Sequence, residues 1–327
     1  MKKIMLLLLA VIVISAGLLY VRNSKSQGVI QSNPELTEIK FGYMPFATNW
    51  AVYVAQRDGF FEKNGVKAEL IKFNVGTEGA DALIRGDIKA FAISTFTDLF
   101  NIQKRSPGQL KLYTLQVSSN KMHGEYLIAK SGSGIEKVTD LKGKKIGVTP
   151  GTLTTAMVKQ AYGDVLDFNK SVTIVPLAPN LHLQSLESGQ IDALLAFEPT
   201  ATLAKQKGIG IIIDDHPWTK VAEPFPVGGV TLSASFIEEN PELAKNIAGA
   251  LKDAILFGRS NPDKITEAVA EFTGLDPSVV AQISYNEDMF GEEVDPKTLS
   301  EASGLYAKLG VVEGTVDTDK MLYVPQN

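Results

Sequence analysis

The sequence predicts an α/β protein made of two similar lobes, and three patterns lead to this prediction. The first is a repeated order of apolar run, small polar loop and helical pattern, which occurs three times between residues 38 and 98. The second is the return of the same order at Lys145, after the glycine-rich stretch 131–134. Alternating strands and helices of this kind form largely parallel sheets flanked by helices, with right-handed crossovers.

The third pattern is an internal repeat. Residues 83–90 and 186–193 both read Leu-x-x-Gly-x-Ile-x-Ala, and each follows a helical pattern and leads into an apolar strand. The glycine suits the end of a helix. Because the repeat falls at matching points of the two series, it favours a pair of similar lobes, which we expect to be joined by linkers near residues 128–134 and 222–228.

The same patterns predict the remaining elements in order. Further strands are expected at 111–117, 125–130, 173–177, 193–197, 209–213 and 230–235, and helices at 242–259, 262–272, 277–285 and 296–309. Prolines stand near the starts of these last four segments, where a missing backbone N–H costs little.

Residues 1–27 have the form of an export signal. Two lysines precede an apolar segment of 18 residues, 4–21, and two further basic residues follow it,. This length lies at the lower edge of what spans a bilayer. We expect the segment either to be cleaved near Ala16 as a signal peptide or to stay as an N-terminal membrane anchor, with residues 28–36 as a linker. In both cases the protein is exported and works in the periplasm or at the extracytoplasmic face of the cell membrane.

Charge and cysteine content exclude several classes of function. The chain of 327 residues has a formal net charge of −5, and the part after residue 27 has 28 basic and 37 acidic residues, a charge of −9. An acidic body without a basic cluster argues against nucleic acid as a partner and against membrane contact beyond the N-terminal segment. The chain has no cysteine, which excludes disulfides, thiolate nucleophiles, cysteine metal sites and a cysteine-linked lipid anchor,.

Residues 144–158 form the stretch around which the other candidate loops are arranged. An apolar run ends at Pro150 and Gly151, and a threonine-rich helix start follows,. The first N–H groups of a helix lack intrahelical partners and carry partial positive charge, so they can hold the oxygens of a small ligand. Thr152 and Thr154 can cap these N–H groups or turn their hydroxyl groups to a ligand. A plain strand–loop–helix connection that binds nothing is the alternative.

Loops of both lobes are expected to meet at one site, because ligands of such sheets lie beyond the carboxyl ends of the strands. Hinged closure would then bury a small ligand between the lobes. The candidate ligand-binding residues in these loops are Phe46, Asn49, Gly76, Thr77, Glu78, Ser94, Thr95, Phe96, Pro150, Gly151, Thr152, Thr154, Phe197 and Glu198.

Two groups in this region have more than one interpretation. The phenylalanines and Trp50 can wall a pocket, although Trp50, at a helix start, can equally belong to the core. Glu78 and Glu198 can act as a general acid/base pair, or one of them can accept a hydrogen bond from a ligand amine or a loop N–H.

Signals for catalysis and for metal binding are weak. His123, His182 and His216 have no partner at the i,i+4 spacing of a helical metal site, so no metal and no cofactor are expected,. The chain contains neither a Gly-x-Ser-x-Gly elbow nor a P-loop,.

Several motifs resemble a known family. Residues 55–70 read Ala-Gln-Arg-Asp-Gly-Phe-Phe-Glu-Lys-Asn-Gly-Val-Lys-Ala-Glu-Leu, and residues 76–78 and the repeat around Gly86 follow; residues 141–148 and 196–200 match in the second series. Over roughly residues 39–309 the chain is similar to the solute-binding proteins of ABC transporters that import sulfonates, taurine, nitrate and thiamine-precursor pyrimidines.

This resemblance implies a type-2 periplasmic-binding-protein fold with a hinge of two crossings. Lobe I would be discontinuous, comprising residues 37–127 and 228–327, and lobe II would comprise residues 128–227. The partners would be a small-molecule ligand and a cognate ABC permease with its ATPase subunit, and the protein would be a monomer. By motif position, the implied ligand contacts are Asn49, Thr77, Ser94, Thr95, Thr152 and Glu198.

The nature of the ligand stays open at this point. Threonine-rich helix starts suit an anion, and we expect one of the sulfonate, taurine or nitrate class. The proposed loops contain no Lys or Arg, however, and two glutamates among aromatic residues suit an amine-bearing heterocycle such as a thiamine-precursor pyrimidine. We expect binding without turnover, so no enzyme. A synthase or dehydratase on the same fold and a membrane-anchored sensor are the other classes.

Overall fold

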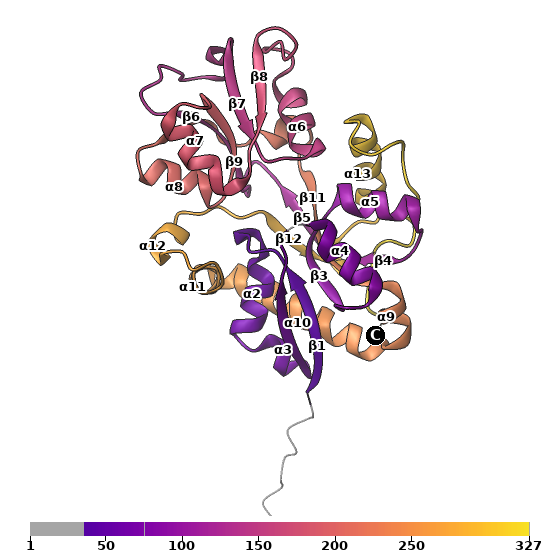
Figure 1. The fold of residues 1–327 in the computed structure, drawn as a ribbon. Coiled ribbons are helices and arrows are strands. Elements are labelled where there is room, and N and C mark those ends of the chain that lie inside the picture. Colours follow the sequence, from indigo (N-terminus) through magenta and orange to yellow (C-terminus); the bar gives the residue numbers. More distant parts are fainter. Residues whose placement is uncertain (1–35, 75, 327) are drawn as a thin grey trace, which may run out of the picture. The chain divides into compact units, whose positions relative to one another are not determined.

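The computed structural model describes residues 36–74 and 76–326, which Figure 1 draws in colour. The residues from Thr37 onward form one compact unit. The predicted signal peptide or anchor at residues 1–27 lies outside the described residues and stays a prediction. Among the helices that the structure describes, none is long and apolar enough to cross a membrane.

Two β-sheets organise the described residues. The seven-stranded sheet has the order β12-β5-β11-β3-β1-β2, with β4 paired to β11, and the five-stranded sheet has the order β10-β6-β9-β7-β8. The strands of the larger sheet are β1 (Thr37–Tyr43), β2 (Val66–Lys72), β3 (Ala90–Thr95), β4 (Leu110–Leu112), β5 (Thr114–Ser118), β11 (Phe225–Ser233) and β12 (Glu287–Phe290). Those of the smaller sheet are β6 (Glu125–Lys130), β7 (Lys144–Val148), β8 (Val172–Pro176), β9 (Ala193–Phe197) and β10 (Gly210–Asp214).

The α/β class is confirmed, but the sheets are mixed rather than mainly parallel. β2, β1 and β3 run parallel in the larger sheet, as do β8, β7 and β9 in the smaller one. The other strands add antiparallel pairs: β11, β5, β4 and β12 in the larger sheet, β6 and β10 in the smaller. Two parallel strands in one sheet need a crossover connection between them, usually a helix. β11 has no such connection to the strands of the larger sheet, because the chain enters it from β10 of the smaller sheet, and it pairs antiparallel with β3.

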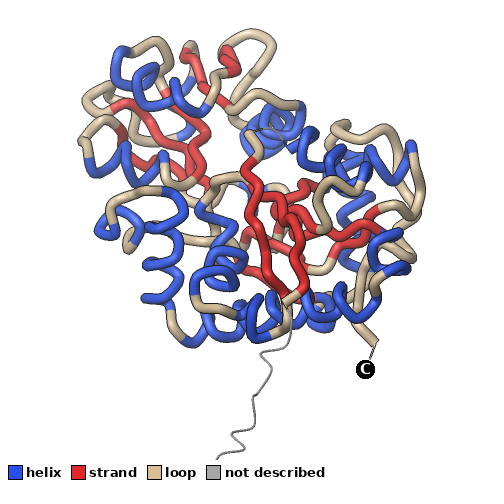
Figure 2. The backbone as a smooth tube through the Cα atoms, turned by 60° about the horizontal axis from the view of Figure 1, so that its bottom comes forward, coloured by secondary structure: helices blue, strands red, loops and turns tan. Residues whose placement is uncertain are grey.

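Helices cover both faces of each sheet (Figures 1 and 2). One face of the larger sheet packs on a core that includes residues of α2, α10 and α11, and the other on a core that includes residues of α4, α5 and α13. In the smaller sheet α6 covers one face, and α7 and α8 cover the other. The helices are α2 (Trp50–Arg57), α3 (Phe60–Lys63), α4 (Gly76–Arg85), α5 (Phe96–Arg105), α6 (Thr152–Tyr162), α7 (His182–Ser188), α8 (Thr200–Gln206), α9 (Ala234–Glu239), α10 (Pro241–Ser260), α11 (Pro262–Thr273), α12 (Pro277–Val280) and α13 (Lys297–Lys308).

Burial on both faces explains why the strands read as continuous apolar runs. In β9, Ala193 and Leu195 belong to one core and Leu194 and Ala196 to the other. Successive side chains of a strand point to opposite faces, so a strand covered on both sides needs an apolar residue at each position.

The chain passes between the two sheets at two places in its described part, as expected for a hinge. β5 and β6 are joined by residues 119–124, and β10 and β11 by residues 215–224. We call these segments the first and the second crossing. The glycine-rich stretch 131–134, predicted as part of a linker, instead follows β6 within the smaller sheet, because it forms the turn that ends this strand. The lobe boundaries at residues 128 and 227 stay predictions.

The C-terminal part differs from the sequence pattern at one point. The helix predicted over residues 277–285 ends at Val280, and the strand β12 follows, paired antiparallel with β5. The pattern does not indicate this strand, because residues 284–288 are mostly polar and gain burial only through the neighbouring strand. β12 therefore depends on tertiary contacts rather than on local sequence.

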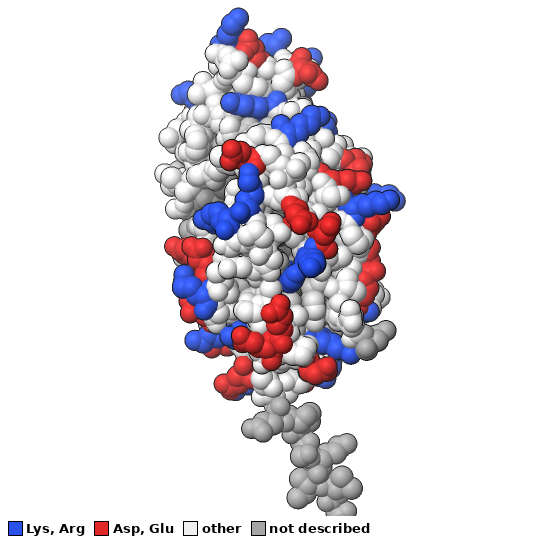
Figure 3. All heavy atoms as spheres, turned by 90° about the vertical axis from the view of Figure 1, so that its right-hand side faces the viewer, with Lys and Arg blue, Asp and Glu red and all other residues white. Residues whose placement is uncertain are grey.

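Acidic and basic side chains are interspersed on the face shown in Figure 3. Close pairs of opposite charge, such as Arg85 with Asp87 at 2.8 Å and Arg259 with Glu293 at 2.7 Å, fit this mixture. On this face the charges do not gather into a patch of one sign.

Candidate functional site

Helix starts gather at the carboxyl ends of the parallel strands in both sheets. α4 follows β2 and α5 follows β3 in the larger sheet, and α6 follows β7 and α8 follows β9 in the smaller sheet. Each start leaves N–H groups without intrahelical partners at this edge. The sequence prediction that these loops share one edge of each sheet is therefore met by the strand order.

The structure brings several of the candidate loops together. A Cβ built on Gly76 would lie 3.3 Å from Asp98 Oδ2 and 3.7 Å from Met44 Sδ, so the loops that follow β1, β2 and β3 are neighbours. Met44 and Phe96 belong to an apolar cluster that also contains Leu153 at the start of α6 and Phe197 at the end of β9. Residues near the carboxyl ends of the parallel strands in both sheets thus contribute to one cluster of side chains.

The candidate residues differ in how accessible they are. The structure places them in three groups and describes only the backbone of Ser94, which pairs with Gly229. Thr77, Glu78, Pro150, Gly151 and Thr152 are exposed; Phe46, Gly76, Thr95 and Phe197 are half-buried; Asn49, Phe96, Thr154 and Glu198 are buried.

The threonines have different roles. Thr95 caps α5, since its Oγ1 accepts from the N–H of Asp98 at 3.3 Å and donates to the Asp98 carboxylate at 2.9 Å. Thr154 donates to the carbonyl of Thr149 at 2.6 Å and so braces the turn before α6. Thr152 is the exposed first residue of α6, and the N-cap Gly151 has no side chain with which to cap the N–H groups. The α6 start is therefore open to a ligand.

Glu198 is committed to the start of α8. Its carboxylate accepts from the N–H of Thr202 at 3.1 Å and from the Thr202 hydroxyl at 2.8 Å, while its own N–H donates to the carbonyl of Gly124 at 2.8 Å. Burial raises the pKa of Glu198 to about 7. The side chain thus stabilises a helix start: the N–H that it binds belongs to Thr202 in the first turn of α8, not to a loop as one interpretation of the sequence had it.

The aromatic residues form a continuous series of ring contacts. Phe197 meets Trp218 at 5.4 Å between ring centroids, Trp218 meets Phe225 at 4.9 Å, and Phe225 leads through Tyr306 to Phe96. The Phe96 ring is fully buried, so it supports the site from within the core. Trp50 is also a core residue, which settles the alternative left open for it.

The loop after β1 is held by three buried polar residues, of which Asn49 was predicted from the sequence as a site residue and Gln116 and Asp288 were not. Asn49 donates to the carbonyl of Met44 at 2.5 Å, and Gln116 on β5 donates to the carbonyl of Thr48 at 2.6 Å. Asp288 lies opposite Gln116 on β12 and is buried, which raises the pKa of its carboxyl group to about 8. No sequence signal marks Gln116 and Asp288, because their burial arises from strand pairing.

Glycine at position 124 allows the first crossing to approach this layer. A Cβ on Gly124 would lie 2.9 Å from Asn286 Oδ1 and 3.8 Å from Thr48 Cγ2. The next residue, Glu125, is buried; its carboxylate accepts from the Ser118 hydroxyl and from the N–H of Gly124 at 3.1 Å. Burial raises the pKa of Glu125 to about 7. The end of the first crossing thus adjoins a buried polar layer.

Thr77 lines a separate pocket, whose lining includes none of the other candidate ligand-binding residues. The pocket has a volume of about 470 Å³ and lies between α4 and α5. Its charged side chains are Asp81, Asp98, Lys104, Arg105 and Glu313. Three acids against two bases do not favour an anion there.

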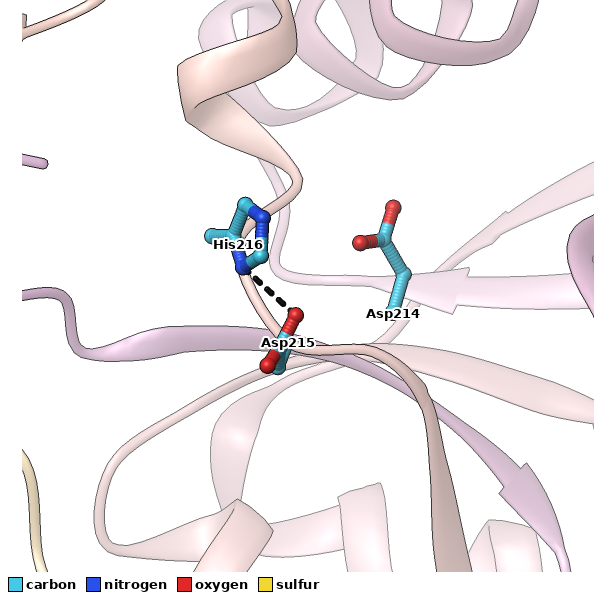
Figure 4. Close-up of side chains that lie close together, drawn as sticks. All are labelled: Asp214, Asp215 and His216. Carbon is cyan, nitrogen blue, oxygen red and sulfur yellow. Dashed lines mark ion pairs between the residues drawn. The ribbon is translucent and has the colours of Figure 1, made fainter. Parts of the chain in front are cut away.

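Three consecutive residues at the end of β10 form the one cluster of potential metal ligands found among the described residues. Ligand atoms of Asp214, Asp215 and His216 all lie within 4.8 Å of one another, and His216 Nδ1 is 2.5 Å from Asp215 Oδ1 (Figure 4). The i,i+4 spacing considered from the sequence could not reveal this cluster, because its members are adjacent in the chain.

Two mixed sheets joined by two crossings, with helix starts gathered at their carboxyl edges, form a fold of the periplasmic-binding-protein type. The chain belongs to the NMT1-like family, whose profile matches residues 32–273. A Bacillus subtilis (strain 168) protein named for binding aliphatic sulfonates is 24% identical over 299 residues, 89% of this chain and 85% of that protein.

Solved structures show the same fold. The periplasmic aliphatic sulphonate binding protein SsuA from Escherichia coli matches with a TM-score of 0.71 and 18% identity, over 90% of this chain and 93% of that one. The desulfurization enzyme DSZB matches with a TM-score of 0.68 and 16% identity, over 88% of this chain and 96% of that one. The fold is therefore shared by binding proteins and by an enzyme.

Proposed function

We propose that this chain is the solute-binding component of an ABC importer and captures a small anion of the sulfonate, taurine or nitrate class. The observation that carries the proposal is the open start of α6. Thr152 is exposed there, and Gly151 leaves the first N–H groups of an 11-residue helix without a side-chain cap. Such a helix start favours the oxygens of an anion.

The state of Glu198 supports an anion over an amine-bearing heterocycle. Both of its carboxylate oxygens accept hydrogen bonds from Thr202, so they are occupied within the chain. Because burial raises the pKa of Glu198 to about 7, its negative charge is only partly present at neutral pH. The thiamine-precursor pyrimidine is therefore the second candidate ligand, and the relative named for sulfonate binding adds to the preference.

Capture without turnover is the mode of action that we propose. The likeness to a desulfurization enzyme concerns the fold. Because the chain has no cysteine, it cannot use a thiolate nucleophile. Binding would close the two sheets' loops over the solute by rotation at the two crossings. The partners would be an ABC permease with its ATPase subunit, and the protein would act as an exported monomer, retained at the membrane, if at all, by its N-terminal segment.

Thermal shift of the 327-residue chain with a panel of solutes tests this function. The panel contains taurine, alkanesulfonates, nitrate and aminopyrimidines. A solute at about a thousand times its dissociation constant stabilises by roughly 4 kcal/mol, or several degrees. We expect a sulfonate-class anion to give this shift without being consumed. A shift with an aminopyrimidine alone would overturn the anion assignment, and consumption of the solute would overturn the binding-protein assignment.

The site assignment has its own test. Thr152→Ala removes one hydroxyl contact from the α6 start and should weaken anion affinity roughly tenfold, since a hydrogen bond to a charged group contributes about 1.5 kcal/mol or more. Thr173→Ala is the matched control, because Thr173 is an exposed threonine near the other end of the same sheet. Equal affinity in both variants would contradict the site.

A further inference from the structure

The two crossings touch each other beside the smaller sheet. The N–H of Asn120 donates to Glu223 Oε1 at 3.2 Å, and the Thr219 hydroxyl donates to Asn120 Oδ1 at 2.9 Å. His123 lies on the first crossing and His216 on the second, with ring centroids 5.7 Å apart and an interplanar angle of 53°. Both histidines therefore occupy the segments that connect the sheets.

Two carboxylates lie close to His216, the member of this pair on the second crossing. Asp214, Asp215 and His216 each place a ligand atom within 4.8 Å of the others, and Figure 4 shows the Asp215 carboxylate below the His216 ring and the Asp214 carboxylate beside it. The side chains of Asp215 and His216 are 61% and 34% exposed, so an ion can reach them from solvent. Asp214 is held in place by the hydroxyl of Tyr162, which donates to its Oδ2 at 2.8 Å.

The contacts of His123 prepare its ring for coordination. Its Nδ1 lies 3.2 Å from the carbonyl of Ser119, so the N–H is placed on Nδ1 and the lone pair on Nε2. Metal-ligating histidines commonly donate their other N–H to a backbone carbonyl in this way. Metal–nitrogen bonds of about 2.0–2.1 Å put the centres of two ligating rings about 5–6 Å apart. The observed separation of 5.7 Å falls in this range.

We propose that Asp214, Asp215 and His216 bind a divalent transition-metal ion of the zinc class, and that His123 turns its Nε2 towards this ion as the fourth ligand. Imidazole and carboxylate ligands in this number suit Zn²⁺. The ion would join the two crossings, since its ligands come from both. Among the described residues, Lys220 is the cation whose ion pair with the cluster is found, with Nζ 3.4 Å from Asp214 Oδ2, and its side chain is 41% exposed and can turn away.

This site is distinct from the proposed solute site. Asp214 contacts Tyr162, the last residue of α6, whereas Thr152 is the first residue of that helix. At a rise of about 1.5 Å per residue the two ends of α6 lie roughly 15 Å apart. Metal binding can therefore be measured without any solute, and its presence or absence does not decide the solute-binding function.

Calorimetric titration of the metal-free 327-residue chain with Zn²⁺ tests the site. We expect one ion per chain, with affinity lowered at least tenfold by His123→Ala and by Asp215→Asn. Asp87→Asn is the matched control, because Asp87 is an equally exposed carboxylate paired with one basic residue and should leave the affinity unchanged. His123→Gln, which keeps a polar side chain, serves as a second variant should the first fail to fold.

The absorption spectrum of bound Co²⁺ gives a second measurement, which would not respond if these four residues only stabilised the fold. Co²⁺ bound by these four ligands should give the visible absorption of a tetrahedral complex, and Zn²⁺ should displace it. Absence of saturable binding, or binding that His123→Ala and His123→Gln leave unchanged, would overturn the proposal.

Discussion

Three carboxyl groups are buried at or near the junction of the sheets: Glu125, Glu198 and Asp288. Burial is the main cause that raises the pKa of each, to about 7, 7 and 8 respectively. Each has polar partners that lower the cost of burial, such as Ser118 for Glu125. A buried carboxyl group without such partners would destabilise the fold by more.

These groups predict how stability depends on pH. The folded chain keeps the proton of Glu125 up to about pH 7, whereas the unfolded chain releases it near the usual value of 4.5. The contribution of this group is therefore fully present below pH 4.5, falls as the pH rises towards 7, and is constant above that. At about 1.4 kcal/mol per pKa unit the fall is at most about 3 kcal/mol.

Glu125→Gln should remove this part of the pH dependence. Urea unfolding at pH 4.5 and at pH 7.5 measures it, as the difference between the wild-type chain and the variant. We expect the variant to lose less stability over this interval than the wild type. A parallel pH dependence in both proteins would show that Glu125 is ionised in the folded chain.

Only some of the site residues could be predicted from the sequence. The cap formed by Thr95 follows from its residue type and its position at the start of a predicted helix, whereas Thr154, expected to cap N–H groups or face a ligand, instead donates to the Thr149 carbonyl,. The burial of Phe96 and the polar layer of Gln116 and Asp288 could not be predicted. Their environment is made by elements more than a hundred residues apart, such as β5 and β12.

At the scale of elements, two helical glycines have opposite surroundings. A Cβ on Gly79 in α4 would lie 2.3 Å from the Phe91 ring, whereas a Cβ on Gly304 in α13 would meet nothing within 4 Å. Gly79 thus allows α4 to pack closely on the larger sheet, and Gly304 has no such contact.

We predict effects of opposite sign for the two alanine substitutions. Gly304→Ala should stabilise by up to about 1 kcal/mol, since alanine favours a helix over glycine. Gly79→Ala should destabilise by roughly 1–3 kcal/mol, because Phe91 must move. Unfolding midpoints in urea measure both, and a stabilising Gly79→Ala would contradict the packing described here.

The sequence periodicity predicts which segments form helices and which form strands, but it does not predict which strands pair with each other. The crossover units β1–α2, β7–α6 and β9–α8 follow from apolar runs that end in small polar loops,. The antiparallel strands and the positions of the crossings depend on which strand each segment meets. A glycine-rich turn such as 131–134 looks the same in sequence whether it ends a strand or joins two lobes.

At the scale of the whole molecule, the polar layer couples the loop after β1 to the hinge region. Gln116→Ala removes the donor to the Thr48 carbonyl and the partner of Asp288. We expect a loss of about 1–3 kcal/mol in stability and a weaker affinity for the solute, because the loop is no longer held. Gln282→Ala is the control, since Gln282 is exposed and should change neither quantity. Stability and affinity are read from urea unfolding and calorimetry.

The central claim is that one solute contacts loops of both sheets. Hydrogen–deuterium exchange of the 327-residue chain, with and without the solute identified by thermal shift, tests it most directly. We expect slower exchange on binding in residues 44–49 of the larger sheet's loops, and in residues 151–155 and 200–202 at the starts of α6 and α8 in the smaller sheet. Protection confined to the loops of one sheet, or no protection at a saturating concentration of solute, would contradict it.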